Sequence, residues 1–479
     1  MGAQYSLLSP EITLAVAAII VLAVGLMLPK GPRKGMVPLT VLAILVTAAV
    51  TGSQFFVGTQ GSFLNGMYFA DPFSNFFKLL FLATALLVVL ASTDYVQKFP
   101  AHRGEFYGLV LFAVLGMMVM SGAGDLITLY IGLETMTITF YVLVAYRTGD
   151  AKSSEAGFKY LVLGSASSAV FLYGVSFLYG LTGSTLISDI ASSLANDMSP
   201  ATILAVVLVF AGFAFKISLI PFHMWAPDIY EGAPTPITAY LAAASKAAGF
   251  AALVRVLIIG LKAQTFGVTT EYVLGALIGI TMIGGNLMAI PQKNFKRMMA
   301  YSSIAQAGYI AIGLLAGTQA GVKGVLFYAM IYAFATMGAF TVAIMVSGVQ
   351  GSAEIKDFAG LARRSPLAAT VMTVSLLSMA GIPPLAGFVG KFYLFTAVID
   401  SGWISLAYVG FVMSMISVYY YLLVVRTMFL DEGANLPVIT PASPAKFSLL
   451  ITMLATVALG VYPSPLAQMA ISAASSLFH

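Results

Sequence analysis

The stretch that decides the fold is Lys216–Arg255, KISLIPFHMWAPDIYEGAPTPITAYLAAASKAAGFAALVR. A lysine stands at the end of an apolar run, and a proline follows it five residues later. Pro221 lacks a backbone N–H and breaks a helix. A second lysine, Lys246, lies among alanines and a glycine, whose small size permits close helix packing. The pattern predicts apolar helices that hold buried charge, one of them interrupted.

Composition extends this interpretation to the whole protein. Of its 479 residues, 60% are hydrophobic and 9% are charged, whereas soluble domains carry about 25% charged residues. A soluble fold is excluded. A bilayer span needs roughly 20 apolar residues, and about 14 such segments occur. We expect the first, residues 8–28, to stay as a helix, because no small-residue cleavage pattern follows it.

A second interrupted span is GIPPLAGFVGKF, residues 381–392, in which two prolines precede Lys391. Two broken spans, each with one lysine and five helices apart, suggest an internal duplication with inverted topology. Broken helices at corresponding positions point to an ion path, although a pair of ordinary proline kinks is the alternative. We therefore predict an all-α polytopic membrane protein, a single membrane domain over residues 1–479, with helices 7 and 12 broken. Its parts are helices 1–3 (1–100), a first repeat of helices 4–8 (101–262), a second repeat of helices 9–13 (271–430), and helix 14 with the C-terminus (444–479).

The sequence offers few ligands for a cofactor. It has no cysteine, which removes iron–sulfur ligation, thioether haem attachment and thiol chemistry. Of its three histidines, His102 lies in a charged loop and His479 is the last residue, so two membrane histidines cannot hold a haem. We expect no cofactor, no metal and no nucleic-acid site in this protein. Electrons, if they flow nearby, must be carried by other subunits.

Lysine and arginine are distributed unevenly among the predicted loops. Only Lys262 and Lys323 lie in loops that join even to odd helices, and fifteen lie in the alternate loops. Cytoplasmic loops carry the excess of such residues. We expect a bacterial inner membrane with both termini on the periplasmic side; a thylakoid-type membrane is an alternative. The fifteen are Lys30, Arg33, Lys34, Lys98, Arg103, Arg147, Lys152, Lys293, Lys296, Arg297, Lys356, Arg363, Arg364, Arg426 and Lys446.

Six remaining cations fall inside predicted spans. A cation at the bilayer centre costs about 2.5–3.5 kcal/mol on insertion scales, so it usually faces a bundle interior or water. Near a helix end, a long basic residue can instead snorkel to the surface. Lys216 and Lys246 lie deep, and Lys391 follows a break, which makes these three the leading candidates. Snorkelling or structural pairing explains the other three equally well: Lys78, Lys159 and Arg255.

Among the acids, Glu134 stands near the middle of predicted helix 5. A buried carboxylate is costly unless it is neutral or paired, and Lys216 is the candidate partner. An ion pair at about 4 Å is worth roughly 4 kcal/mol at an effective dielectric constant near 20. We therefore hypothesise that Glu134 controls the proton affinity of Lys216. Lys246 and then Lys391 would relay the proton at mid-membrane.

A secondary proton path is predicted on the cytoplasm-like side. His223 follows Pro221 and can exchange a proton near physiological pH, although a hydrogen-bonded structural histidine is an equal alternative. Lys159 is the second member of this path. Asp228 and Glu231, in the same polar stretch, are expected to be solvated charges at the proton entrance.

Three long motifs, in order, resemble those of a known family. They are the stretch after Lys216, KRMMAYSSIAQAGY at Lys296–Tyr309, and GIPPLAGFVGKF. Over nearly the whole sequence they resemble the antiporter-like subunits of respiratory complex I, the proton-pumping NADH:quinone oxidoreductase. The sequence is most similar to the N-type branch. Lys391 stands where M-type members have glutamate, and the sequence ends soon after helix 14, whereas L-type members continue into a long lateral helix.

The resemblance implies a proton-translocating subunit without a redox centre, driven by quinone reduction elsewhere in the complex. NADH, FMN, iron–sulfur clusters and quinone would belong to partner subunits. The resemblance also assigns proton translocation to four residues: Glu134, Lys216, Lys246 and Lys391. Gln306 departs from the histidine of many members, so no titrating role is expected there. The alternatives are a photosynthetic or F420-type dehydrogenase complex, a cation/proton antiporter, and a structural module that no longer pumps.

Overall fold

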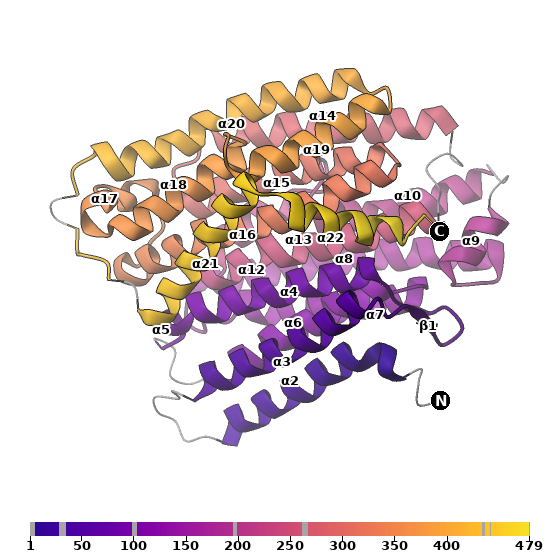
Figure 1. Ribbon diagram of the computed structural model, residues 1–479, viewed down its shortest axis with the longest axis horizontal. Coiled ribbons are helices and arrows are strands. Elements are labelled where there is room, and N and C mark those ends of the chain that lie inside the picture. Colours follow the sequence, from indigo (N-terminus) through magenta and orange to yellow (C-terminus); the bar gives the residue numbers. More distant parts are fainter. Residues whose placement is uncertain are drawn as a thin grey trace.

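The computed structural model forms one bundle of helices that lie broadly side by side (Figure 1). Thirteen helices in the described residues are long and apolar enough to cross a membrane, which confirms the predicted all-α polytopic fold. Some charges used for orientation and two histidines lie outside the described residues: Lys30, Arg33, Lys34, Lys98, Lys262, His102 and His479. The structure describes residues 5–27, 35–97, 103–194, 199–260, 267–433, 436–440 and 442–478.

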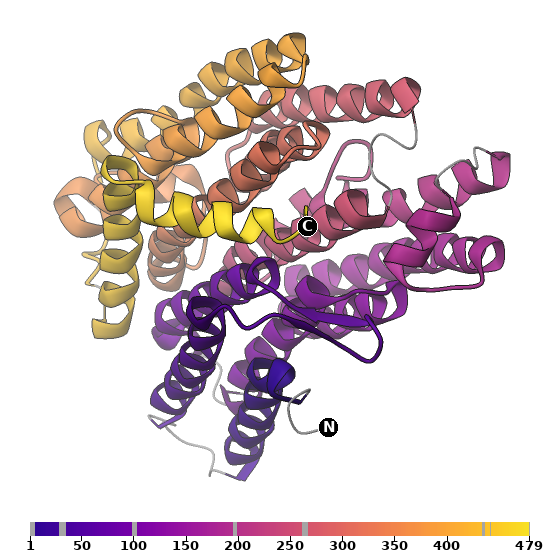
Figure 2. The same ribbon diagram turned by 45° about the vertical axis from the view of Figure 1, so that its right-hand side comes forward.

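The N-terminal elements form one edge of the bundle, indigo and purple in Figures 1 and 2. They are η1 (Ser6–Leu8), α2 (Ser9–Met27), α3 (Met36–Val57), β1 (Gly61–Phe63), β2 (Tyr68–Ala70), α4 (Pro72–Ala91), α5 (Thr93–Val96) and α6 (Arg103–Gly122). The two strands pair antiparallel, with Gly61 opposite Ala70. Asp71 caps α4 by accepting a hydrogen bond from the backbone N–H of Ser74. α2 and α4 both pack against α6, which attaches this edge to the rest.

The middle of the sequence supplies the first interrupted helix. Its elements are α7 (Leu126–Val144), α8 (Ala151–Thr182), α9 (Ile187–Ser193), α10 (Pro200–Ile217), α11 (Trp225–Gly232), α12 (Thr235–Tyr240), η2 (Leu241–Ser245), α13 (Lys246–Arg255) and η3 (Val256–Gly260). α10 ends where Ser218 takes a left-handed conformation with φ of 62°. Pro221 follows before α11 begins, so the predicted break in helix 7 is confirmed.

The second half of the sequence supplies the other interrupted helix. Its elements are α14 (Gly267–Ala289), α15 (Phe295–Leu315), α16 (Gln319–Gln350), η5 (Ile355–Phe358), α17 (Leu361–Arg364), α18 (Pro366–Ala380), α19 (Ala386–Asp400), α20 (Ile404–Leu430), α21 (Ser443–Val461) and α22 (Ser464–Ser475). Gly381 ends α18 with φ of 88°, a conformation that glycine adopts without strain. α18 and α19 together form predicted helix 12, which is broken as expected. With the thirteen longer helices, it completes the predicted set of spans.

Predicted helix 8 has two further irregularities that the sequence did not indicate. The five residues before Lys246 and the five after Arg255 form π-helical segments, η2 and η3. Such segments are rare and often lie at functional sites. Lys246 therefore begins α13 directly after an irregular turn.

Burial separates the central helices from the outer ones. In the apolar windows of α15 and α16, 94% of the residues are buried, against 33% for the window that includes α2. α22 lies across the bundle in both views and packs on α16 and α4 (Figures 1 and 2). The centre of the protein thus consists of α15 and α16, shielded from the membrane by the remaining helices.

Candidate functional site

Lys216 is the next-to-last residue of α10 and lies at the first helix break. Its Nζ donates a hydrogen bond to the Thr137 hydroxyl on α7, at 2.8 Å. Thr137 lies one turn after Glu134 on α7, so the two residues share a face of that helix. The lysine is thus directed toward the helix that carries the predicted carboxylate, but its direct contact is a hydroxyl.

Glu134 is half-buried, and its Oε1 accepts a hydrogen bond from the Ser168 hydroxyl on α8. The structure does not form the expected Glu134–Lys216 ion pair, because Thr137 occupies the position nearest to the ammonium. A small cavity between α7, α8 and α10 is lined by Thr137, Ser168 and Lys216, among others. Glu134 and Lys216 therefore bond to residues around one cavity.

Lys246 joins the two halves of the protein. Its Nζ donates to the Ser303 backbone carbonyl at 2.9 Å and to the Ser303 hydroxyl at 2.7 Å. Ser303 belongs to α15, in the predicted second repeat. The Tyr230 ring lies 5.9 Å from the ammonium, within the range of a cation–π interaction. On the first-repeat side, a Cβ built on Gly249 would lie 3.4 Å from the Lys216 Cγ, so α13 and α10 approach closely there.

α15 presents a row of neutral polar residues after Ser303. Gln306 and Tyr309 follow at intervals of three residues, which places all three along one side of the helix. Gln306 donates through Nε2 to the Met379 carbonyl at 3.0 Å and accepts at Oε1 from the Tyr328 hydroxyl. All its hydrogen bonds are to uncharged groups.

Lys391 lies at the second helix break. Its Nζ donates to the Ser414 hydroxyl on α20 at 2.7 Å and to the Ala380 carbonyl at 3.2 Å. Ala380 ends α18, where the carbonyls of the last turn have no partner within the helix. The Tyr309 ring lies 4.4 Å from the ammonium. The row on α15 therefore extends from Lys246 at Ser303 to Lys391 at Tyr309.

The predicted secondary path lies in a charged surface network. Lys159 is paired with Glu155 at 2.7 Å and with Asp228 at 3.0 Å, and its side chain is 39% exposed. Asp228 also pairs with Arg297 at 2.7 Å. Asp228 and Glu231 are partly exposed, as expected, and they are also paired: Glu231 binds the same arginine at 3.2 Å, because basic residues from α8 and α15 converge on α11.

His223 lies between α10 and α11, at the first break, and is half-buried. Its Nδ1 is buried and has no hydrogen-bond partner among the described residues. The structure therefore places His223 at the first break and Lys159 in the surface network.

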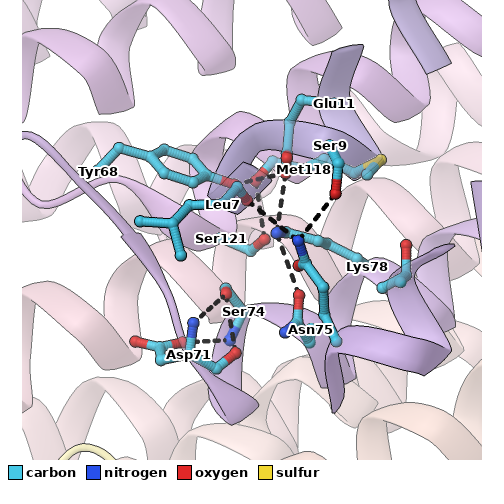
Figure 3. Close-up of polar contacts among 12 residues, drawn as sticks. Leu7, Ser9, Glu11, Tyr68, Asp71, Ser74, Asn75, Lys78, Met118 and Ser121 are labelled. Carbon is cyan, nitrogen blue, oxygen red and sulfur yellow. Dashed lines mark hydrogen bonds and ion pairs between the residues drawn. The ribbon is translucent and has the colours of Figure 1, made fainter. Parts of the chain in front are cut away.

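A buried ion pair on the N-terminal edge was not predicted (Figure 3). Lys78 on α4 pairs with Glu11 on α2 at 2.9 Å, and the Tyr68 hydroxyl donates to the same carboxylate oxygen. Lys78 also donates to the Asn75 amide oxygen at 3.2 Å. Burial, followed by the negative charge of Glu11, raises the pKa of Tyr68 well above its usual value, so the phenol stays a donor. No local pattern connects Glu11 with a lysine so distant in the sequence.

Arg255 is the other buried cation that the sequence left open. It pairs with Asp71 at 2.9 Å and donates to the Ser121 carbonyl at 3.1 Å. For both Arg255 and Lys78, structural pairing is confirmed and snorkelling is excluded, because neither cation reaches the surface. Within the described residues, no group of three or more histidine, aspartate or glutamate residues is placed to hold a metal ion.

Comparison with known proteins supports a relationship over the full length. Residues 123–417 match the model of the NADH:quinone oxidoreductase/Mrp antiporter transmembrane family. A curated relative from Desulfitobacterium hafniense, NADH-quinone oxidoreductase subunit N, is 59% identical over 493 aligned positions, which cover 100% of this chain and 99% of the relative.

Solved structures give the same picture at lower identity. A subunit of respiratory complex I from Thermus thermophilus with bound aureothin is 33% identical, with a TM-score of 0.83 over 96% of this protein and 99% of that subunit. A subunit of the Mrp complex from a Dietzia species has a TM-score of 0.86 over 99% of this protein and 98% of that subunit. At 21% identity, the second likeness concerns the fold alone.

Proposed function

The chain belongs to the NADH:quinone oxidoreductase/Mrp antiporter family, and we propose that it moves protons through Glu134, Lys216, Lys246 and Lys391. The relatives confirm the resemblance to N-type subunits of complex I. The protein is a proton-translocating, multi-pass membrane subunit of an NADH:quinone oxidoreductase, and its partners are other membrane subunits of that complex. How protons cross it is the subject of the proposal.

The observation that supports the proposed path is the burial of three lysines that have no carboxylate in contact among the described residues. Lys216, Lys246 and Lys391 are 4%, 2% and 3% exposed. Each bonds to hydroxyl or carbonyl groups from a neighbouring segment. Keeping a cation in the membrane costs several kcal/mol and usually marks an ion pathway. A fold that keeps three such lysines, two of them beside polar residues that lie along one side of α15, fits a proton relay.

We assign different roles to the members of the path. Glu134 modulates Lys216 through space across the cavity, because hydroxyls separate the two groups. Lys246 transfers the proton between the halves, and Lys391 receives it at the second break. His223, at the first break, is the secondary exchange site, and the network around Lys159 marks the entrance on the cytoplasm-like side.

The path agrees with the proposed internal organisation. We propose two inverted repeats, residues 101–262 and 271–430, because each contains one helix that breaks beside a lysine. We further propose that both termini face the periplasm of a bacterial inner membrane, on the strength of the lysine and arginine distribution. NADH, FMN, iron–sulfur clusters and quinone are placed in partner subunits; the lack of cysteine in this protein supports this placement for the clusters.

A cation/proton antiporter is the second candidate function, and the Mrp fold likeness is the observation in its favour. Sequence identity favours the oxidoreductase, because the 59% identical relative is a quinone oxidoreductase subunit. Gene neighbourhood separates the two, since genes for other complex I subunits beside this one support the first function and antiporter genes support the second.

The test of the proposed path is Glu134→Gln and Lys216→Ala in the assembled complex. We expect normal assembly and a sharp loss of quinone reduction coupled to proton pumping, measured in membrane vesicles. The matched control is Glu354→Gln, which neutralises a glutamate in an exposed pair with Lys356 and leaves the membrane interior unchanged. Wild-type pumping in assembled Glu134→Gln and Lys216→Ala complexes contradicts the path.

A further inference from the structure

The three lysines of the path share one kind of partner. Lys216, Lys246 and Lys391 each donate to a single hydroxyl group, at 2.8, 2.7 and 2.7 Å. These hydroxyls come from three different helices, α7, α15 and α20, and belong to Thr137, Ser303 and Ser414. The repetition is not a product of one local sequence pattern, because the partners lie 79, 57 and 23 residues from their lysines.

Two other buried cations of the described residues have a carboxylate as their side-chain partner, whereas Arg364 bonds to backbone carbonyls. Lys78 pairs with the Glu11 carboxylate, and Arg255 pairs with that of Asp71, both at 2.9 Å. Both residues are as deeply buried as the three lysines, with 0% and 1% of their surface exposed. Burial alone therefore does not select a hydroxyl partner in this protein.

A hydroxyl and a carboxylate respond differently when a lysine loses its proton. The hydroxyl oxygen accepts a hydrogen bond from an ammonium, and its O–H donates to the lone pair of a neutral amine. An ionised carboxylate only accepts, so a neutral amine leaves it as an unpaired buried charge, which is strongly unfavourable. A carboxylate therefore holds a lysine in the charged form, whereas a hydroxyl serves both forms.

The geometry at Ser414 supplies an alternative position for the hydroxyl hydrogen. Ser414 Oγ donates to the Ala380 carbonyl at 2.9 Å while it accepts from Lys391. Ser303 Oγ likewise donates to the Ala300 carbonyl at 2.7 Å while it accepts from Lys246. While the lysine is charged, the hydroxyl hydrogen of each serine thus points toward a backbone carbonyl oxygen. It has only to rotate about the Cβ–Oγ bond of the serine to reach the lysine nitrogen in the neutral state.

We propose that Thr137, Ser303 and Ser414 are positioning residues that let the adjoining lysines change protonation state in place, an inference that rests on the proposed function. In each step one ammonium N–H bond breaks, the proton passes to the next acceptor of the relay, and the electron pair stays on Nζ. The hydroxyl keeps its own proton and turns its O–H toward that electron pair. Reprotonation reverses the rotation.

The test compares three substitutions of Ser414 in the assembled complex, by the number of protons pumped per electron. Ser414→Ala removes the hydroxyl, Ser414→Thr keeps it, and Ser414→Asp offers a stronger partner that only accepts. We expect the ratio to stay near wild type in the threonine variant and to fall in the alanine and aspartate variants. A hydroxyl that merely anchors the lysine predicts the opposite for aspartate, so a wild-type ratio there overturns the proposal.

Two controls keep the outcome interpretable. Ser417→Ala removes a buried hydroxyl one turn further along α20, which donates to the Ser414 carbonyl, and should pump normally. Lys391→Ala tests the underlying path. Normal pumping in Lys391→Ala overturns both claims at this position, whereas impaired pumping there with a wild-type ratio in Ser414→Ala overturns the hydroxyl role alone.

A second position protects the test against a variant that does not assemble. Thr137→Val keeps nearly the shape of the residue and removes the hydroxyl, and Thr137→Ser keeps the hydroxyl. We expect the valine variant to lower the proton-to-electron ratio and the serine variant to retain it. Equal ratios in assembled valine and serine complexes contradict the proposal at Lys216.

Discussion

The buried cations that have a side-chain partner among the described residues form two groups, and the kind of partner distinguishes them. Lys216, Lys246 and Lys391 have hydroxyl partners, whereas Lys78 and Arg255 have carboxylates. All five are at most 4% exposed, so depth of burial does not separate the groups. The difference teaches that a charge inside a membrane protein is not by itself a proton carrier. A carboxylate partner stabilises one charge state, and a hydroxyl partner accommodates two.

Helical context separates the three lysines from Lys78, but not from Arg255, which ends α13 directly before the π-helical segment η3. Lys216 and Lys391 lie near complete breaks, and Lys246 directly follows a π-helical segment. Lys78 lies within the uninterrupted helix α4. Helix ends present backbone carbonyls without partners in the helix, which gives an uncharged environment that still offers acceptors. At Lys391, the break thus supplies the Ala380 carbonyl as an uncharged acceptor for the ammonium.

The largest effect on stability is expected for Lys78→Met. The substitution leaves Glu11 as an uncompensated buried charge, and breaking a buried pair in this way costs about 3–5 kcal/mol. We expect little assembled complex, and the complex that forms should dissociate into subunits at a lower temperature than wild type. The double variant Glu11→Gln/Lys78→Met removes both charges and should recover most of the loss. No recovery in the double variant would contradict the role of Glu11 as the partner.

A smaller effect is expected for Tyr68→Phe. It removes the hydroxyl that donates to the Glu11 carboxylate but leaves the Lys78 pair in place. Hydrogen bonds to charged groups contribute about 1.5–3 kcal/mol. The dissociation temperature should fall less than in Lys78→Met, with an unchanged proton-to-electron ratio. If the assembled variant lost proton pumping, the Lys78–Glu11 pair would belong to the proton path and would not have a purely structural role.

Lys246→Met should lower the stability of the complex still less than Tyr68→Phe does, but it should strongly reduce proton pumping. Its partner Ser303 remains hydrogen-bonded to the Ala300 carbonyl, so no buried charge is left behind. We expect near-normal assembly and loss of pumping, measured in vesicles with complex content matched to wild type. An assembly defect as large as that of Lys78→Met would remove the distinction between the two groups.

The smallest effect is expected for Lys159→Gln. The lysine is partly exposed, and pairs between exposed charges contribute little because water screens them. The dissociation temperature should not change measurably. Pumping should decrease modestly at most, because other basic groups remain in the network; complete loss would place Lys159 on the main path.

The sequence predicted the features that arise from one residue type in a local context. Prolines within apolar runs, such as Pro221, located both breaks, and depth within a span located Lys216 and Lys246. The partners are contacts between distant segments, and serine and threonine are too common for Ser303 or Ser414 to stand out. The expected Glu134–Lys216 ion pair does not form, because Thr137, one helical turn further along α7, accepts the hydrogen bond from the lysine. Glu11 went unnoticed because its partner lies on another helix.

The most direct test of the account uses Ser303, where the path crosses between the two halves. Protons pumped per electron should be compared in assembled complexes that carry Ser303→Thr and Ser303→Asp. The account predicts a ratio near wild type for threonine, which keeps the hydroxyl, and a strongly reduced ratio for aspartate, which holds Lys246 in its charged form. A wild-type ratio in the aspartate variant would contradict the claim that a neutral partner is what lets these lysines carry protons.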